Sequence, residues 1–245
     1  IIGDIGNTST RVCLFDKSKI LKSIIFDTKK IFLKGFFKRI INRFSKKNLK
    51  NEILFSCVVP LALKEIKKSL KKTNYRILEI KSLNLKKMIK INIKNFKQLG
   101  SDRIVNSIKG KEFKNCLIID FGTATTFDIV KNETYEGGVI APGIKLSIKN
   151  LSHSTALLPI FDLKNQQKSY GKNTNDALNA GFIWGYEGLI NNIINKITRN
   201  WKMKYKIVLT GGYANLFKKI IKSKKSIVDQ NITIKGVSKV YREFL

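Results

Sequence analysis

The chain has 245 residues, of which 43% are hydrophobic and 10% aromatic. This composition excludes a mostly disordered polymer and allows one large domain or two small ones, each with a real core. No apolar run approaches the roughly 18 residues that a membrane-spanning helix requires, and no signal peptide heads the sequence. We therefore expect a soluble, cytoplasmic protein with no membrane partner.

The chain is strongly basic, with 48 Lys and Arg against 17 Asp and Glu and a formal net charge of +31. Such a charge attracts polyanions, ATP included, through its long-range field. The lysines are spread from end to end without a basic tail, and charge alone indicates only non-specific attraction to nucleic acid. We therefore expect no specific nucleic-acid partner.

Histidine and cysteine usage limits the metal chemistry. The only histidine is His153, so a multi-histidine metal site is excluded, and we expect His153 to be a surface or structural residue. The cysteines lie far apart in apolar runs and form no CxxC, which argues against a zinc site or a disulfide framework. They are expected to be buried thiols: Cys13, Cys57 and Cys116.

The first half of the chain alternates between strand and helix periodicity. The segments expected to be strands are 1–5, 10–16, 20–26, 52–59 and 75–80. Helical spacing is found in 33–44 and in 60–72, where Pro60 suits the first helical position. This alternation is typical of an α/β domain that opens with an antiparallel meander.

The second half restarts the same pattern. The strands expected there are 116–120, 125–130, 135–143 and 206–212, and the helices are 143–152 and 174–199. The order of strand, Asp, Gly, hydroxyl and strand repeats the opening of the chain. The sequence therefore predicts two similar α/β lobes, 1–112 and 113–245.

Two Asp–Gly turns follow apolar runs. They contain Asp4, Gly6, Asn7 and Thr8 in one case and Asp120, Gly122, Thr123 and Thr125 in the other. Nucleotide phosphates require N–H donors, small residues for close approach, and a carboxylate for the neutralising metal. Each turn alone is also explained by an Asp that caps its own backbone. Two such turns in one chain favour phosphate binding.

A third motif, "GSDR" at 100–103, stands at the start of an amphipathic helix. Asp102 can act as a general base for a hydroxyl, and Arg103 can grip a carboxylate through its planar fork. The structural alternative is a first-turn acid that favours the helix dipole, followed by a solvated arginine. Thr174 similarly stands where a helix N-cap belongs, and capping alone would explain it.

Taken in order, the motifs "DIGNT", "GSDR", "DFGTATTFD", "GGVIAPG", "LSHSTALLP", "GKNTNDALNAGFIWGY" and "TGG" resemble type III pantothenate kinase. That family belongs to the acetate and sugar kinase, heat-shock ATPase and actin superfamily. The resemblance implies two ribonuclease-H-like (actin-like ATPase) lobes with a nucleotide cleft between them, in a homodimer whose substrate pocket is completed at the dimer interface. It also implies ATP-dependent phosphorylation of pantothenate to 4′-phosphopantothenate, the first step of coenzyme A biosynthesis.

The resemblance also implies roles for residues at matching positions. Asp102 would be the general base, Asp120 would ligate a monovalent cation (K⁺ or NH₄⁺), and Mg²⁺ would accompany ATP. The ATP-binding residues would be Asp4, Ile5, Gly6, Asn7, Thr8, Ser9, Thr10, Arg11 and Thr123. The pantothenate-binding residues would be Gly100, Ser101, Asp102, Arg103 and Thr174.

The chain departs from the family pattern ahead of "GSDR". Ile93 stands where the family usually has Tyr, and Phe96 stands where it has Pro. A missing Tyr hydroxyl would weaken pantothenate binding more than the chemistry, because a lost hydrogen bond costs about 0.5–1.5 kcal/mol. The alternatives are a non-catalytic, transcription-associated regulator on the same scaffold and another phosphotransferase or phosphatase of the superfamily.

Overall fold

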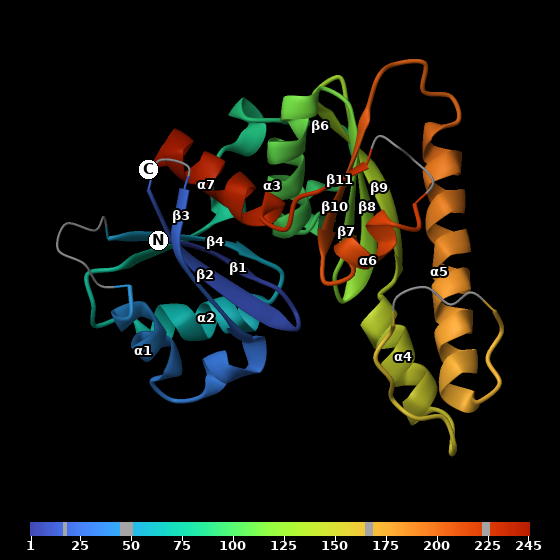
Figure 1. Ribbon diagram of the computed structural model, residues 1–245. Helices are drawn as coiled ribbons and strands as arrows, with labels where there is room; N and C mark the ends of the chain where they lie inside the picture. Colours follow the sequence, from blue (N-terminus) through green and yellow to red (C-terminus); the bar gives the residue numbers. More distant parts are fainter. Residues whose placement is uncertain (17–18, 45–50, 165–168, 222–225) are drawn as a thin grey trace. The chain divides into compact units, whose positions relative to one another are not determined.

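The computed structural model describes residues 1–16, 19–44, 51–164, 169–221 and 226–245 (Figure 1). The chain divides into two compact units. The first unit comprises Ile1–Glu112, Lys131–Gly137 and Asn231–Leu245, and the second comprises Phe113–Val130 and Gly138–Gln230. The division into lobes 1–112 and 113–245 stays a prediction, and these units differ from it in placing 131–137 and 231–245 in the first unit.

The first unit is built on a five-stranded sheet with the order β3-β2-β1-β4-β5. Its strands are β1 (Ile2–Ile5), β2 (Ser9–Asp16), β3 (Lys19–Asp27), β4 (Glu52–Cys57) and β5 (Arg76–Glu79). β1 and β2 pair antiparallel, as do β2 and β3, whereas β1, β4 and β5 run parallel to one another. The carboxyl ends of β1, β4 and β5 therefore lie at one edge of this sheet.

Helices cover both faces of the first sheet (Figure 1). α1 (Phe36–Asn42) and α2 (Pro60–Ser69) share a core with Ile53 and Phe55 of β4. α3 (Ser101–Gly110) and α7 (Ile232–Phe244) share a core with Leu54 on the other face. This arrangement follows from the strand period of two, which sends neighbouring residues of β4 to opposite faces.

Shorter elements complete the first unit, most of them between β5 and α3. They are η1 (Thr28–Phe32), η2 (Ile80–Ser82), η3 (Leu85–Lys87), β6 (Lys90–Ile91), η4 (Phe96–Gln98) and η5 (Lys111–Phe113). β6 pairs parallel with Thr134 and Tyr135 at the start of β9 (Thr134–Pro142). Tyr135 is buried in the same core as α3 and α7, so the segment 131–137 belongs structurally to this unit.

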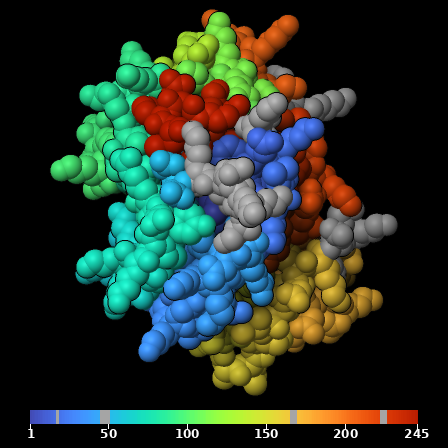
Figure 2. All heavy atoms as spheres, turned by 90° about the vertical axis from the view of Figure 1, so that its left-hand side faces the viewer, coloured from blue at the N-terminus to red at the C-terminus, as the bar shows by residue number. Residues whose placement is uncertain are grey.

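α3 and α7 pack at very close range. A Cβ atom built on Gly236 of α7 would lie 2.1 Å from the carbonyl oxygen of Val105 in α3. The Thr233 hydroxyl also donates a hydrogen bond of 2.8 Å to Oδ1 of the buried Asn106. In Figure 2, α7, in red, lies at the surface of the face that is shown. The C-terminal helix therefore covers the outer side of α3.

We expect Gly236→Ala to destabilise the protein by about 2–4 kcal/mol, because the added methyl group must push two packed backbones apart. The change should be visible as a lower midpoint in urea unfolding. Ser238→Ala is a suitable control on the same helix, because Ser238 is also buried and the substitution removes an atom instead of adding one. A Gly236→Ala variant as stable as the wild type would contradict this packing.

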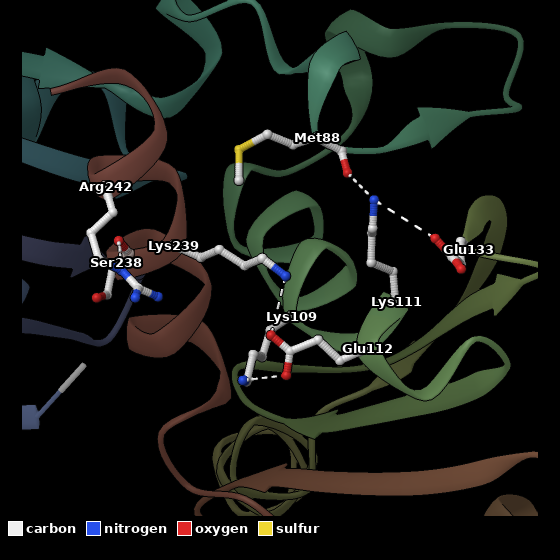
Figure 3. Close-up of polar contacts among 8 residues, drawn as sticks. All are labelled: Met88, Lys109, Lys111, Glu112, Glu133, Ser238, Lys239 and Arg242. Atoms are coloured by element: carbon white, nitrogen blue, oxygen red, sulfur yellow. Dashed lines mark hydrogen bonds and ion pairs between the residues drawn. The ribbon is translucent and has the colours of Figure 1, made fainter. Parts of the chain in front are cut away.

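Polar contacts hold the far end of α3, as Figure 3 shows. Glu112 accepts hydrogen bonds from Lys109 and from Lys239 of α7. The Lys111 ammonium group donates a hydrogen bond of 2.7 Å to the carbonyl oxygen of Met88, and it lies 3.9 Å from the Glu133 carboxylate. Because such partly exposed ion pairs contribute about 0–1 kcal/mol each, the apolar contacts supply most of the attachment.

The second unit repeats the strand arrangement of the first. Its strands are β7 (Cys116–Phe121), β8 (Ala124–Lys131), β9, β10 (Lys206–Gly211) and β11 (Ser226–Val228), in the order β11-β10-β7-β8-β9. β7 pairs antiparallel with β8 and parallel with β10, as β1 does with β2 and β4. The helices are α4 (Ile144–His153), α5 (Thr174–Thr198) and α6 (Ala214–Lys218), and they share one core with the sheet.

The expected α/β fold with two related sheets is confirmed, and every strand and helix named in the sequence analysis is found with shifted ends. The 52–59 strand ends at Cys57 and the 60–72 helix ends at Ser69. Cys13 and Cys116 are buried as expected, whereas Cys57 is half-buried at the end of β4. His153 is exposed. Within the described ranges, we find no helix with the length and apolarity needed to cross a membrane.

Candidate active site

Three polar side chains gather at the edge of the first sheet where its parallel strands end. Asp4 lies near the end of β1, opposite Ser56 of β4, and is half-buried. Cys57 and Glu79 are the last residues of β4 and β5. Because the ends of parallel strands meet at one edge, the fold places these groups together although they are far apart in the sequence.

The first turn of α3 stands over this edge. Gly100 is its N-cap, and the buried Ser101 hydroxyl lies 3.1 Å from the Cys57 carbonyl oxygen and within hydrogen-bond distance of the Glu79 carboxylate. The backbone N–H of Arg103 donates a hydrogen bond of 2.8 Å to Oδ1 of Asp102. A Cβ atom on Gly100 would lie 2.4 Å from that same oxygen, so the glycine leaves room for the carboxylate.

Asp4 lies close enough to Asp102 for the charge of one carboxylate to act on the other. Burial raises the pKa of Asp4 to about 7, and the negative charge of Asp102 adds to the effect, while Ser56 and Arg11 act in the opposite direction. Burial also raises the pKa of Asp102, against the stabilising influence of the Arg103 backbone N–H and guanidinium. Two carboxylates in one poorly solvated site disfavour their common ionisation. Such a pair is ready to receive a cation or a proton.

The residues after Asp4 form a tight loop, in which the Gly6 N–H donates 3.0 Å to the Ser9 carbonyl. Asn7, Thr8 and Ser9 are exposed. Ile5 is fully buried, and the buried Thr10 hydroxyl is hydrogen-bonded to Thr28 at 2.9 Å. Ile5 and Thr10 can therefore contribute only backbone groups to a ligand.

The Arg11 side chain is hydrogen-bonded to two other residues of the first unit. Its Nε donates 2.9 Å to the Ser23 hydroxyl, and one terminal nitrogen donates 2.7 Å to Oδ1 of Asn231. These contacts join β2, β3 and the residue before α7. A role in phosphate binding would require the guanidinium to exchange one of these partners, and it stays a prediction.

The second unit carries the other Asp–Gly turn. Asp120 is half-buried near the end of β7, and Gly122 and Thr123 are exposed between β7 and β8. A Cβ atom on Gly143 would lie 1.9 Å from the Thr123 carbonyl oxygen, so the turn rests directly on the start of α4. The start of α4 thus supports the turn, while Gly122 and Thr123 stay accessible to solvent.

Thr174 lies in a different part of the second unit. It is the first residue of α5 and lines an apolar cavity of about 750 Å³ between α4 and α5. Asn173, not Thr174, is the N-cap, because its side-chain oxygen accepts a hydrogen bond of 2.9 Å from the Asp176 N–H. Capping therefore does not explain Thr174, and its hydroxyl stays a candidate for substrate binding.

In the first unit, Asp4 lies within electrostatic reach of Asp102, and Gly100, Ser101 and Arg103 belong to the same helix start as Asp102. In the second unit, Asp120 and Thr123 lie at the connection between β7 and β8. Sequence reasoning missed Ser56 and Glu79. Glu79 had a visible signal, since it closes the apolar run 75–80 at the end of a strand, as Asp4 closes its own. In the part of the chain that the structure describes, no group of three or more His, Cys, Asp or Glu side chains forms a metal cage.

Comparisons with known proteins agree on one family. The profile of type III pantothenate kinase matches residues 1–196. The type III pantothenate kinase of Pelagibacter ubique is 47% identical over 241 residues, which cover 97% of this chain and 96% of that protein.

Solved structures support the fold. One named as a Baf family transcriptional activator from Campylobacter jejuni has a TM-score of 0.62 at 22% identity and covers 99% of this chain and 97% of its own. A 2-dehydro-3-deoxygalactonokinase protein from Sinorhizobium meliloti has a TM-score of 0.61 at 12% identity, covering 99% and 98%. At these identities the likeness shows the fold alone. The family match and the Pelagibacter relative decide the assignment: the chain belongs to the type III pantothenate kinase family.

Proposed function

We propose that this protein transfers the γ-phosphoryl group of ATP to the primary hydroxyl of pantothenate, the first step of coenzyme A biosynthesis. Family membership supports the reaction. The observation that carries the assignment of residues is that the first turn of α3, which contains Asp102, is hydrogen-bonded to the end of β4 beside β1, within electrostatic reach of Asp4. The Asp102 carboxylate can accept the proton of the pantothenate hydroxyl, and the Asp4 carboxylate can bind the Mg²⁺ ion that accompanies the ATP phosphates.

In the proposed mechanism, Asp102 is the general base. Its carboxylate accepts the proton of the pantothenate hydroxyl as the oxygen bonds to the γ-phosphorus, and the bond from phosphorus to the β–γ bridging oxygen breaks to release ADP. The raised pKa of Asp102 suits a base, because efficiency is highest when the pKa approaches the working pH. Arg103 next to it would bind the pantothenate carboxylate through its fork.

In each unit the turn of the Asp–Gly motif offers N–H groups and exposed hydroxyls as donors to ATP. Thr8 and Ser9 in the first unit and Thr123 in the second are exposed and stand close to glycines. Backbone N–H groups in such turns bind phosphate oxygens well. This contribution is mainly positioning and charge stabilisation, as phosphoryl transfer requires.

The residues at Asp4 fit a Mg²⁺ ion that accompanies ATP. Burial and, to a smaller extent, the charge of Asp102 raise the pKa of Asp4, and a bound divalent cation would stabilise the ionised carboxylate against both effects. Mg²⁺ is usually held by one or two carboxylates together with substrate phosphates, which agrees with the small number of acids here. When bound, Mg²⁺ would neutralise charge on the phosphates during transfer.

Asp120 fits a monovalent cation such as K⁺ or NH₄⁺. Its Oδ1 and the Phe121 carbonyl oxygen both lie 2.6 Å from the point where a Cβ on Gly211 would stand. Two oxygen atoms therefore converge on the side of the turn where glycine leaves space. Carboxylate and carbonyl oxygens are the ligands that hard cations prefer.

The test is ADP release measured with and without pantothenate, in buffers with K⁺ or with Na⁺. Turnover that requires pantothenate and rises with K⁺ supports the proposal. ATP hydrolysis that is indifferent to pantothenate would favour another phosphotransferase of the superfamily, and no turnover at all would favour a non-catalytic regulator. The likeness to the structure named as a transcriptional activator does not favour that regulator, because at 22% identity it shows the fold alone.

We also propose that the protein is a homodimer joined through the apolar face of α4 and α5. The cavity between these helices is lined mainly by apolar groups, and Trp184 on α5 is 44% exposed. Cβ atoms on Gly181, Gly185 and Gly188 would meet no atom within 4 Å. This glycine stripe leaves room for a partner helix, and the same cavity contains Thr174, which the resemblance assigns to pantothenate.

Gly185→Leu tests the dimer. We expect this variant to elute as a monomer, because the larger side chain fills the space left for the partner, while its Cβ meets nothing in its own chain. Sedimentation or light scattering at micromolar concentration gives the mass, and Lys196→Leu, an exposed position of α5 outside the cavity, is the control. A wild-type protein that is monomeric would overturn the dimer without affecting the chemistry.

A further inference from the structure

Ser101 stands immediately before Asp102 and is completely buried. Its Oγ lies within hydrogen-bond distance of the Glu79 carboxylate and 3.1 Å from the Cys57 carbonyl oxygen. We call the contact between Ser101 and Glu79, with the Cys57 carbonyl as its second acceptor, the α3 latch. It joins the first turn of α3 to the ends of β4 and β5, the strands that follow β1 in the sheet.

The direction of the hydrogen bond in the α3 latch is defined: the Ser101 hydroxyl donates and Glu79 accepts. A hydroxyl carries one proton, and a carboxylate is a stronger acceptor than a carbonyl, so Ser101 donates mainly to Glu79. The second carboxylate oxygen of Glu79 accepts a hydrogen bond of 2.7 Å from the backbone N–H of Lys81, at the start of η2. Glu79 is therefore held at both oxygens, and the proton of the Ser101 hydroxyl is already engaged.

The latch controls the placement of the residue that follows it. The Asp102 carboxylate is oriented by the N–H of Arg103, which belongs to the same turn. If this turn shifts, both atoms shift together, and the distance from Asp102 to Asp4 changes. The side chain of Ser101 connects the turn to the strand ends.

We propose that Glu79 is a positioning residue for the phosphoryl transfer: through Ser101 it fixes the first turn of α3 so that Asp102 faces the hydroxyl to be activated. This inference rests on the proposed function. It also changes the expected role of Ser101, which the resemblance assigns to pantothenate binding. Its hydroxyl belongs to the latch, and its backbone N–H is the group left for a substrate.

A double-mutant cycle tests the latch. Ser101→Ala and Glu79→Ala are each expected to lower kcat about tenfold to a hundredfold, because a displacement of about 1 Å can cost that much. KM for ATP should stay within about twofold. The double variant should be no slower than the worse single variant, since both changes remove the same connection. Additive losses would overturn the proposal, and so would a higher pantothenate KM at unchanged kcat in Ser101→Ala.

Glu79→Gln is the conservative rescue. The Gln carbonyl can accept from the Lys81 N–H while its amide donates to Ser101, whose hydroxyl then donates to the Cys57 carbonyl. We expect this variant to keep most of the wild-type kcat. Ser107→Ala is the matched control, because Ser107 is equally buried on α3 and its hydroxyl bonds the Arg103 carbonyl of its own helix. A Glu79→Gln variant as slow as Glu79→Ala would contradict the latch.

Hydrogen exchange separates a failure of the latch from a failure of the proposed function. The amides of Arg103 and Ile104, which donate to Asp102 Oδ1 and to the Gly100 carbonyl, should exchange faster in Ser101→Ala and Glu79→Ala than in the wild type, whereas Ser107→Ala should leave them unchanged. This readout does not depend on pantothenate. If the wild type lacks pantothenate-dependent turnover, the proposed function fails and exchange still decides the latch; unchanged exchange in both latch variants overturns it.

Discussion

Asp102→Asn is expected to lower kcat for pantothenate phosphorylation by about 10²–10⁴-fold, the range that a general base contributes. The amide oxygen can still accept the hydrogen bond from the Arg103 N–H, so the first turn of α3 should keep its shape. Affinity for ATP should change little, because the base acts on the acceptor hydroxyl. Steady-state ADP release and nucleotide binding by calorimetry measure the two quantities separately.

Asp16→Asn is the control for this substitution, because Asp16 is exposed at the end of β2 and outside the site. The pH profile gives a second check. Because the pKa of Asp102 is raised, its basic form is lost as the pH falls through that raised value, and kcat should fall with it. A variant with near-normal kcat would exclude Asp102 as the base.

The second large effect concerns stability: Asp4→Asn should make the ligand-free protein more stable at pH 8 by on the order of 2 kcal/mol. The folded protein raises the pKa of Asp4 from 3.8 to about 7. The protonated form is thus favoured by folding, and its contribution is lost as the pH rises from about 4 through about 7. Asparagine has no charge to bury and avoids this penalty, while phosphoryl transfer should be lost.

Urea unfolding of wild type and Asp4→Asn at several pH values measures this difference. The gap between the two curves should narrow as the pH falls from about 8 toward about 4, because the wild-type carboxyl then becomes neutral in the folded state. Asp27→Asn provides a comparison with an exposed carboxylate that accepts a local hydrogen bond from the Lys29 N–H. A constant gap, or a less stable Asp4→Asn, would contradict the electrostatic description of the site.

The repeated pattern of strand, Asp and Gly was sufficient to predict two related sheets, because hydrophobic periodicity and turn residues are local signals. Asp4 and Asp120 were found in this way, each followed by glycine. The start of α3 at Ser101 was also visible, since Gly100 breaks the preceding segment and the apolar residues of α3 recur at helical spacing. What local signals cannot give is the distance between Asp4 and Asp102, which depends on the packing of α3 over the sheet.

Other features depend on contacts between distant segments or on the exact start of a helix. Glu79 reads as an ordinary strand-end acid until Ser101 is seen to be bonded to it. The interpretation of Thr174 as a cap was wrong because Asn173, one residue earlier, is in the right position to accept from the Asp176 N–H. The resemblance assigned Arg11 to ATP binding, and only its long-range hydrogen bond to Asn231 shows that it also connects distant segments of the first unit.

The close packing of α7 on α3 affects how the protein is made. The sheet of the first unit and α3 lie within residues 1–112, whereas α7 is synthesised only after the second unit has been made up to Gln230. Until then α3 lacks the helix that packs against it, while the second unit can already fold. Premature termination within α7 would therefore impair the unit that is translated first.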